Sequence, residues 1–334
     1  MVGLEVISSF AMSRGIRSWQ RSLLVASVCV FYAIPDYGQL NGLHIIGHLY
    51  APHGKSPQKT EFSSCWGWVS PDGKEYAFVS TYTGTSIVDL NADTMKEIQF
   101  VLGPPSGYCY REVKTYKHYA YIVTDYPTTL QPYVGIQILD LSGLPDTVIL
   151  VKDTIYVDPV DTSRNLRTSH TLSYADGYLY CNGSAKWGPD GTVILSLLKD
   201  PENPELAGSY EPQYLHDTYI RHDTLYGAAI ATVGGLYVVD VKDKLNPVLL
   251  GKITYTGSGT HNAWASIDGH YAFTVDEVGG TTHDIKVWAL DSLPNSVKVA
   301  EWSADPTRRS DRPIRASRCR VRGADSRADP TDGL

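Results

Sequence analysis

Hydrophobic and polar positions follow one another in short, turn-bounded runs along this chain, and the stretch from Tyr214 to Val241 shows the pattern most completely. It holds three runs rich in Tyr, Val, Ile and Thr, separated by the turn His222-Asp223 and by Gly234-Gly235. Such runs predict β-strands joined by tight turns. Three short strands cannot bury both faces of their own sheet, so the pattern predicts copies of itself on either side.

The copies lie along the rest of the chain. The third run recurs as Gly84-TSIVDL, Gly135-IQILDL, Gly191-TVILSL, Gly235-LYVVDV and Asp284-IKVWAL. A distinctive residue opens the first run of each copy, namely Trp66, Arg111, His170, His216 and His261, which are 45, 59, 46 and 45 residues apart. A fourth run follows an Asn/Pro-rich turn, as in Pro247-VLLGKITY. This period of four strands predicts an all-β fold, a β-propeller of four-stranded blades.

The repeat sets the expected extent of the propeller domain, residues 40–303. Five complete blades are predicted over residues 61–101, 107–155, 165–210, 213–256 and 259–303. The segment from Leu43 to Tyr50 forms a single predicted strand without partners in its own unit. Because one terminus of a propeller often completes the blade of the other, we interpret it as the strand that seals the ring.

Residues 1–39 have the pattern of a secretory signal region. From Met12, a basic front with Arg14, Arg17 and Arg21 precedes the apolar stretch from Leu23 to Ile34. That stretch of 12 residues is too short to span a bilayer, and polar residues follow it. The order predicts cleavage near Gly38, a mature chain without a transmembrane span, and a secreted or cell-surface location. A buried N-terminal helix is the alternative.

The composition changes abruptly near the end of the chain. Eight arginines lie from Ser303 onward, against seven in the preceding 302 residues, and the hydrophobic period stops. We predict a disordered Arg-rich tail over residues 304–334 that is not part of the propeller. A change of reading frame and a basic interaction tail are the alternatives. The chain carries a net charge of −7 and the last 32 residues, with five Asp, contribute +3, so the remainder carries −10. This acidic body argues against a nucleic-acid partner, and we expect a monomer.

Three histidines occupy equivalent positions in successive blades, His170, His216 and His261. The first strands of propeller blades surround a central channel, so these imidazoles can converge on a divalent metal. Asp276 and Glu277 are candidate carboxylate ligands. The alternative is that these side chains form hydrogen bonds between blades and fill the polar mouth of the channel.

Four further residues are candidates for ligand binding. Arg111 occupies the same repeat position as the histidines and suits an anionic ligand, and Asp217 adds a carboxylate beside His216. Trp66 and Trp264 can form an aromatic platform for a saccharide or a peptide. Tryptophans that wedge between blades are the alternative interpretation.

Short enzyme motifs are missing from the sequence. It contains no His-Glu-x-x-His, and Gly54-Lys55-Ser56 lacks the upstream glycine of a phosphate-binding loop. The sequence therefore favours a propeller that binds a protein, peptide or saccharide without chemistry of its own. The alternative is a metal-dependent, hydrolase-like enzyme that uses the histidine cluster.

Several motifs together resemble the choice-of-anchor B family, exported bacterial proteins built of LVIVD-type propeller repeats. They are GxxIVDL followed by Asn-Pro, SSCWGWVSPDGKEYAFVSTYTGTSIVDL, YREVKTYKHYAYIVTD, LHD and THNAW…VDE, in the family's order over about residues 42–302. This chain departs from the family pattern at Tyr110-Arg111-Glu112, where the family has Trp-Arg-Asp, and at His261-Asn262-Ala263-Trp264, where it has His-Gln-Gly-Trp. The resemblance implies a ring of seven blades, of which this chain would lack the last two, and a surface location, and it implies no established catalytic activity.

Overall fold

The computed structural model describes residues 4–9, 43–49, 62–91, 95–103, 110–125, 135–230, 234–278 and 284–303. The predicted signal segment 12–39 and the Arg-rich segment 304–334 lie outside these residues. All regular structure in the described residues is β-strand. Within the same residues there is no helix with the length and apolar character needed to cross a membrane.

Five four-stranded antiparallel sheets form the predicted blades. Blade 1 contains β3 (Phe62–Val69), β4 (Glu75–Thr81), β5 (Gly84–Asp89) and β6 (Lys96–Leu102). Blade 2 contains β7 (Arg111–Tyr116), β8 (Tyr119–Thr124), β9 (Ile136–Asp140) and β10 (Ile149–Thr154). Blade 3 contains β13 (Thr171–Ala175), β14 (Tyr178–Ser184), β15 (Gly191–Ser196) and β16 (Glu205–Tyr210). Blade 4 contains β17 (Asp217–Arg221), β18 (Thr224–Ala229), β19 (Gly235–Asp240) and β20 (Val248–Ile253). Blade 5 contains β21 (Thr260–Ala265), β22 (Tyr271–Asp276), β23 (Ile285–Ala289) and β24 (Lys298–Trp302).

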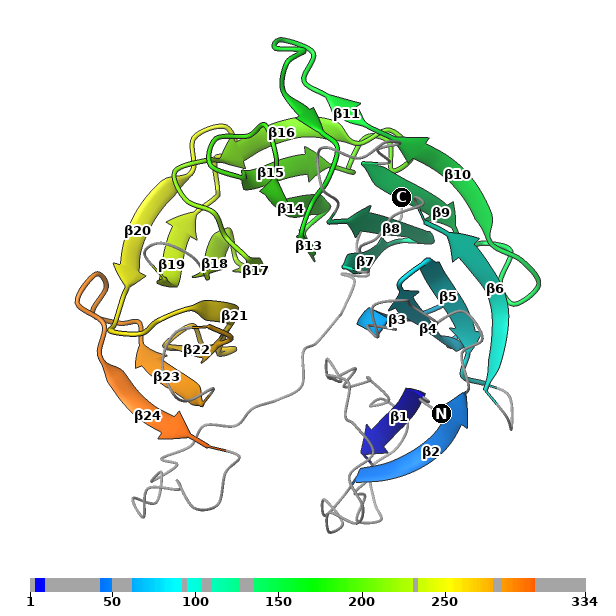
Figure 1. Cartoon of the computed structure of the whole chain (residues 1–334), viewed down its shortest axis with the longest axis horizontal. Coiled ribbons are helices and arrows are strands. Elements are labelled where there is room, and N and C mark those ends of the chain that lie inside the picture. The colour runs from blue at the N-terminus through cyan, green and yellow to red at the C-terminus, as the bar shows by residue number, and fades with distance from the viewer. Residues whose placement is uncertain are drawn as a thin grey trace.

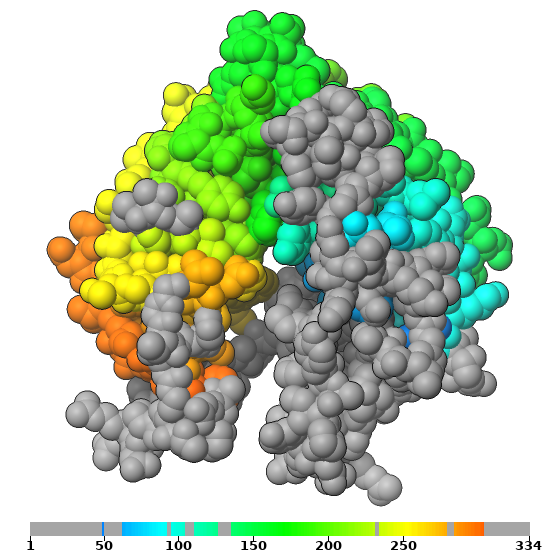
Figure 2. Space-filling model, viewed as in Figure 1, coloured from blue at the N-terminus to red at the C-terminus, as the bar shows by residue number. Residues whose placement is uncertain are grey.

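The blades stand side by side in an arc around a common centre (Figure 1). Their first strands β3, β7, β13, β17 and β21 lie innermost, and their fourth strands form the outer rim (Figure 1). In the space-filling view the blades follow one another as a continuous surface from cyan to orange (Figure 2). This arrangement confirms the propeller and its five four-stranded blades, while the ring of seven stays a prediction.

The repeated glycine and aspartate of the third strand each have a structural reason. A side chain at Gly84 would place its Cβ 2.2 Å from the carbonyl oxygen of Val101 on the neighbouring fourth strand, and Gly235 approaches Ile253 equally closely. Only glycine permits this approach of two backbones. The aspartate at the end of the strand accepts a hydrogen bond from the amide two residues later, as Asp240 Oδ1 does from the Lys242 amide at 2.8 Å.

The hydrophobic core is divided among the interfaces between blades. Each of four buried clusters joins two successive blades, and the cluster between blades 4 and 5 includes Tyr226, Leu236, Val238, Ile253 and Trp288. Alternation along each strand therefore gives two apolar faces, one for the preceding blade and one for the following blade. This packing fixes the positions of the innermost strands and of the side chains at their first residues.

Two small sheets lie outside the five blades. β11 (Tyr156–Val157) and β12 (Asn165–Leu166) form a short hairpin between blades 2 and 3. β2 (Leu43–Leu49) is the strand predicted to seal the ring, and it pairs antiparallel with β1 (Leu4–Ser9), which the repeat pattern did not predict. Among the described strands β2 pairs with β1 alone, so ring closure by β2 stays a prediction.

Candidate functional site

The three candidate histidines lie at the inner ends of blades 3, 4 and 5. His170 and His216 directly precede β13 and β17, and their amides donate to the carbonyls of Asn182 (2.8 Å) and Ala228 (2.7 Å) on the second strands. His261 lies in β21 at a register shift between Thr260 and Asn262. Such a bulge re-aims a side chain, and bulges are frequent next to functional sites.

The imidazoles form a continuous row across the three blades. His170 Nε2 lies 2.6 Å from His216 Nε2, and the ring centroids of His216 and His261 are 4.3 Å apart. Glu277 extends from the end of β22 and places Oε2 3.6 Å from His261 Nε2 and 4.0 Å from His216 Nε2. Ligand atoms of His216, His261 and Glu277 all lie within 4.8 Å of one another. We call His170, His216, His261 and Glu277 the histidine cluster.

Asp125, just beyond the end of β8, completes the arrangement from blade 2. Its Oδ2 lies 2.8 Å from His170 Nδ1. A carboxylate that accepts the Nδ1 proton holds the imidazole in one orientation and leaves Nε2 as the free ligand atom, as in the carboxylate–histidine–metal arrangements of metalloproteins. Asp125 is not among the site residues predicted from the sequence, although it ends the repeated run HYAYIVTD. It reaches His170 because β8 of blade 2 contacts β13 of blade 3.

His216 is the buried centre of the cluster, with 6% of its surface exposed. Burial, together with His170 and His261 on either side, lowers the pKa of His216 to about 3. Its Nδ1 lies 3.2 Å from the carbonyl oxygen of His261, which can only accept, so Nδ1 carries the single proton of the neutral ring. Nε2 of His216 therefore presents a lone pair toward His170.

The contact between His170 and His216 brings two ring nitrogens to a distance that suits a shared proton or a bound cation. Both Nδ1 atoms face acceptors, so both Nε2 atoms direct lone pairs at each other across 2.6 Å. Two lone pairs at this separation repel each other unless a proton or a metal ion lies between them. Zinc–nitrogen bonds of about 2.0–2.1 Å in tetrahedral geometry separate two ligand nitrogens by roughly 3.3 Å, so metal binding requires a small outward shift of the rings.

Asp276 does not join the histidine cluster, in contrast to its predicted role as a ligand. Asp276 is the last residue of β22 and is buried, whereas Glu277 follows the strand and is exposed. The Asp276 carboxylate is buried and accepts from Lys286 Nζ at 2.9 Å, Tyr255 Oη at 2.6 Å and Thr260 Oγ1 at 3.1 Å. These contacts use the carboxylate to join blades 4 and 5, so Asp276 has a structural role.

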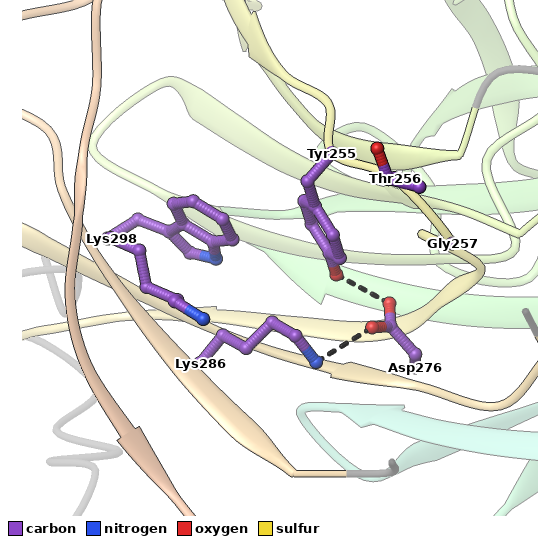
Figure 3. A pocket seen from close by; sticks show the side chains of 7 residues that line it. Tyr255, Thr256, Gly257, Asp276, Lys286 and Lys298 are labelled. Atoms are coloured by element: carbon purple, nitrogen blue, oxygen red, sulfur yellow. Dashed lines mark hydrogen bonds and ion pairs between the residues drawn. The ribbon is translucent and has the colours of Figure 1, made fainter. Parts of the chain in front are cut away.

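The ion pair between Asp276 and Lys286 borders a pocket of about 400 Å³ (Figure 3). The pocket is lined by Tyr255, Thr256, Gly257, Asp276, Lys286, Trp288 and Lys298. Each of its ammonium groups has a carboxylate partner, Asp276 for Lys286 and Glu301 for Lys298. The pocket therefore offers little net positive charge to an anionic ligand.

Arg111 is buried and lies apart from the imidazole row, although it shares their repeat position. Its guanidinium turns back toward blade 1 and donates to the carbonyls of Thr81 (3.1 Å) and Tyr82 (3.3 Å) and to Thr124 Oγ1 (2.8 Å). A side chain at Gly103 would collide with this guanidinium, at 2.1 Å from one of its nitrogens. These contacts indicate a structural link between blades 1 and 2, and a role in anion binding stays a prediction.

Trp66 and Trp264 pair with Phe78 and Phe273 on the second strands of their blades and so occupy equivalent positions. Trp66 is therefore not the counterpart of the three histidines, as its spacing in the sequence predicted, and the two indoles have different surroundings. Trp66 donates its indole N–H to Thr115 Oγ1 of the next blade at 2.9 Å, as expected for a wedge between blades. Trp264 stacks on Tyr219 with a centroid distance of 3.9 Å and is 52% exposed. The structure therefore separates the two indoles into a wedge and an exposed stack instead of a common platform.

Asp217 supports the cluster indirectly. Its Oδ2 accepts from Asn262 Nδ2 at 2.8 Å, and Asn262 Oδ1 contacts the Nδ1 atom of His261. Asp217 thus links the first strands of blades 4 and 5 and orients His261 through Asn262.

Comparison with known proteins bears on the fold. No protein-family model matches the chain, and no curated protein sequence matches it. Among solved structures, the periplasmic gluconolactonase PpgL of Pseudomonas aeruginosa matches with a TM-score of 0.52 and 15% identity, over 79% of this chain and 79% of that one. A functionally unknown protein from Desulfotomaculum acetoxidans matches with a TM-score of 0.52 and 10% identity, over 77% of this chain and 72% of the other. At these identities the likeness is one of fold alone, and it supports the β-propeller architecture.

Proposed function

We propose that this propeller binds a divalent transition metal in the histidine cluster and uses the metal to hold a ligand. The observation that carries the proposal is the convergence of His170, His216, His261 and Glu277 from three blades, with a buried neutral imidazole at the centre. Neutral imidazoles and a carboxylate are the donors that zinc, iron, copper and nickel take in proteins.

The direction of ligand approach follows from the exposure of the cluster. His216 is enclosed, whereas Glu277 is exposed. A metal held from the enclosed side keeps its open coordination position on the side of Glu277. A small ligand with an anionic or neutral donor atom, such as a carboxylate, hydroxyl or imidazole, suits this position.

The test is the metal content of the purified full-length protein after equilibration with Zn²⁺ or Co²⁺ and removal of free metal. We expect about one metal ion per chain, its loss in His216→Ala, and weaker retention in Glu277→Gln. His270→Ala is the matched control, because His270 is an exposed histidine bonded to Asp291 outside the cluster. The proposal fails if the wild type binds no metal, or if His216→Ala retains as much metal as His270→Ala.

The second candidate function is metal-dependent hydrolysis, and the open side next to Glu277 favours it. A metal lowers the pKa of its bound water toward 7 and supplies a hydroxide nucleophile at neutral pH, and a nearby carboxylate can accept the proton of that water. Hydrolysis of activated esters by the zinc-loaded protein, with loss of the rate in Glu277→Gln at a zinc concentration that saturates this variant, supports this function. Equal rates in the loaded and metal-free proteins exclude it.

We further propose that the chain is an exported member of the choice-of-anchor B family. The family motifs support this assignment, since GxxIVDL spans the third strand β5 and the related GLYVVDV spans β19, and their glycines and the aspartate of β19 have the structural reasons given above. N-terminal sequencing of the protein recovered outside the cytoplasm tests it. Cleavage near Gly38 is the expected result, and an intact N-terminus on protein retained in the cytoplasm contradicts the proposal.

A further inference from the structure

The pocket between blades 4 and 5 is a second candidate site, and it shares no residue with the histidine cluster (Figure 3). One part of its wall is exposed and belongs to the connection from β20 to β21, with Thr256 and Gly257. The rest comes from β22, β23 and β24, on the side of blade 5 that faces blade 4, because Trp288 packs into the cluster shared by these two blades. Its volume of about 400 Å³ lies within the range of about 300–1,000 Å³ of small-molecule sites.

An aromatic pair gives the pocket an apolar wall. Tyr255 stacks on Trp288 with a centroid distance of 5.1 Å and an angle of 29° between the ring planes. The Trp288 indole donates to Thr274 Oγ1 at 2.9 Å, and the Tyr255 hydroxyl donates to the Asp276 carboxylate at 2.6 Å. Because both polar tips are bonded within the protein, the two residues present carbon surface to the pocket.

The two lysines of the pocket keep hydrogen-bond donors for a ligand. The side chain of Lys286 is 8% exposed, and its Nζ donates to Asp276 at 2.9 Å and to the Asp284 carbonyl at 3.4 Å. Lys298 Nζ donates to Glu301 at 2.6 Å. An ammonium group carries three N–H donors, so each lysine can donate to at least one oxygen atom of a ligand. Figure 3 shows both side chains in the pocket, with Tyr255 across from them.

The balance of charge favours a neutral ligand. Glu301 lies 2.6 Å from Lys298 and 3.9 Å from Lys286, and together with Asp276 it balances the two positive charges. An anion would therefore gain little, and a cation would meet two ammonium groups. A hydroxyl group suits the mixture, because it can accept from a lysine and donate to the Glu301 carboxylate.

We propose that this pocket binds a neutral sugar, with one face of the pyranose ring on Tyr255 and Trp288 and its hydroxyl groups bonded to Lys286 and Lys298. A ring with apolar C–H groups on its faces and hydroxyl groups on its rim matches a site that combines an aromatic wall with a few polar groups. Binding at this site requires no metal.

Saturation-transfer NMR on the full chain in the presence of a chelator tests the sugar site. Glucose, galactose and N-acetylglucosamine are the neutral probes, and glucuronate is the anionic probe. We expect a neutral sugar to bind, and to bind more tightly than glucuronate. Lys298→Ala removes a donor and is expected to weaken binding at least about threefold. Thr256→Trp narrows the exposed side of the pocket and has the same expected direction, without changing the contact between Lys298 and Glu301.

Lys252→Ala is the matched control, because Lys252 is an exposed lysine of β20 outside the pocket. It is expected to bind as the wild type does, and thermal melts check that each variant folds. His216→Ala is also expected to keep the binding, so a failure of the metal proposal leaves the sugar site standing. The sugar site is overturned if no neutral sugar binds, if glucuronate binds as tightly, or if Lys298→Ala and Thr256→Trp bind like Lys252→Ala. Loss of binding in folded His216→Ala would place the sugar at the histidine cluster and also overturns it.

Discussion

Removal of the Asp276 carboxylate separates the structural role of this residue from the metal role predicted for it. In Asp276→Ala the ammonium of Lys286 stays buried, and its nearest remaining carboxylate is Glu301, at 3.9 Å. Breaking a buried ion pair by deleting one partner costs about 3–5 kcal/mol, since an uncompensated charge remains in the interior. At about 2–4 °C per kcal/mol for a domain of this size class, the melting temperature is expected to fall by roughly 6–20 °C.

The double variant Asp276→Ala/Lys286→Met isolates the cause of the loss. Removing both charges leaves no buried unpaired ion, so at least about 2 kcal/mol of the loss in Asp276→Ala is expected to return. Denaturant unfolding of the wild type, both single variants and the double variant measures the four free energies of unfolding. Metal content is measured in parallel and is expected to be unchanged in Asp276→Ala. A loss below about 1 kcal/mol, or a loss of bound metal from folded protein, refutes this account of Asp276.

Three further predictions concern the histidine cluster and its supports. In metal-free protein with chelator, the lowered pKa of His216 means that the unfolded chain binds its proton between pH 6.5 and about 3 while the folded protein does not, so stability falls as pH falls. At about 1.4 kcal/mol per pH unit, His216 accounts for roughly 2–3 kcal/mol of destabilisation between pH 7 and 4.5. Denaturant unfolding of His216→Gln is expected to lack this part of the pH dependence. Equal slopes of unfolding free energy against pH in the wild type and the variant contradict the prediction. Asp125→Asn is expected to weaken Zn²⁺ binding about 10–100-fold, measured by competition with a chromophoric chelator, and an unchanged affinity argues against its positioning role. Gly183→Ala forces an L residue to a φ of +66° and puts a methyl group 3.0 Å from the His170 Cβ, so a loss of roughly 1–3 kcal/mol is expected in thermal melts, and wild-type stability contradicts it.

The blades were predictable from the sequence because their signals are local and repeated. Glycine begins the third-strand run in four of the five blades, where it permits close approach to the fourth strand, and aspartate ends the run in three, where it caps the turn that follows. The same period placed the three histidines at equivalent positions, and the structure brings their rings into contact. The repeat gives the three histidines equivalent positions in their blades, and the packing of the blades around one centre brings these positions close together in space.

The supports of the cluster were not predictable in the same way. Asp125 lies 45 residues before His170 and reaches it only because β8 and β13 belong to blades in contact. Asp276 and Glu277 are neighbours in sequence, but Asp276 ends β22 with its carboxylate on Lys286, while Glu277 lies beyond the strand next to His261. Arg111 has the repeat position of a ligand, but its length lets the guanidinium reach carbonyls of the preceding blade. Equivalent backbone positions therefore do not ensure equivalent side-chain positions.

The two ends of the histidine cluster differ in how firmly they are held, and this difference sets where a ligand can enter. At the blade 3 end, His170 is fixed by Asp125, and His216 is enclosed and bonded through the His261 carbonyl. At the blade 5 end, His261 sits on a bulge and Glu277 is exposed, so both side chains can adjust as a metal binds. His261 and Glu277 can therefore adjust around a metal bound to His216, whereas a metal between His170 and His216 requires two firmly held rings to separate from 2.6 Å. The open coordination position therefore belongs on the side of blade 5, where exchange of water for a ligand disturbs the fewest buried contacts.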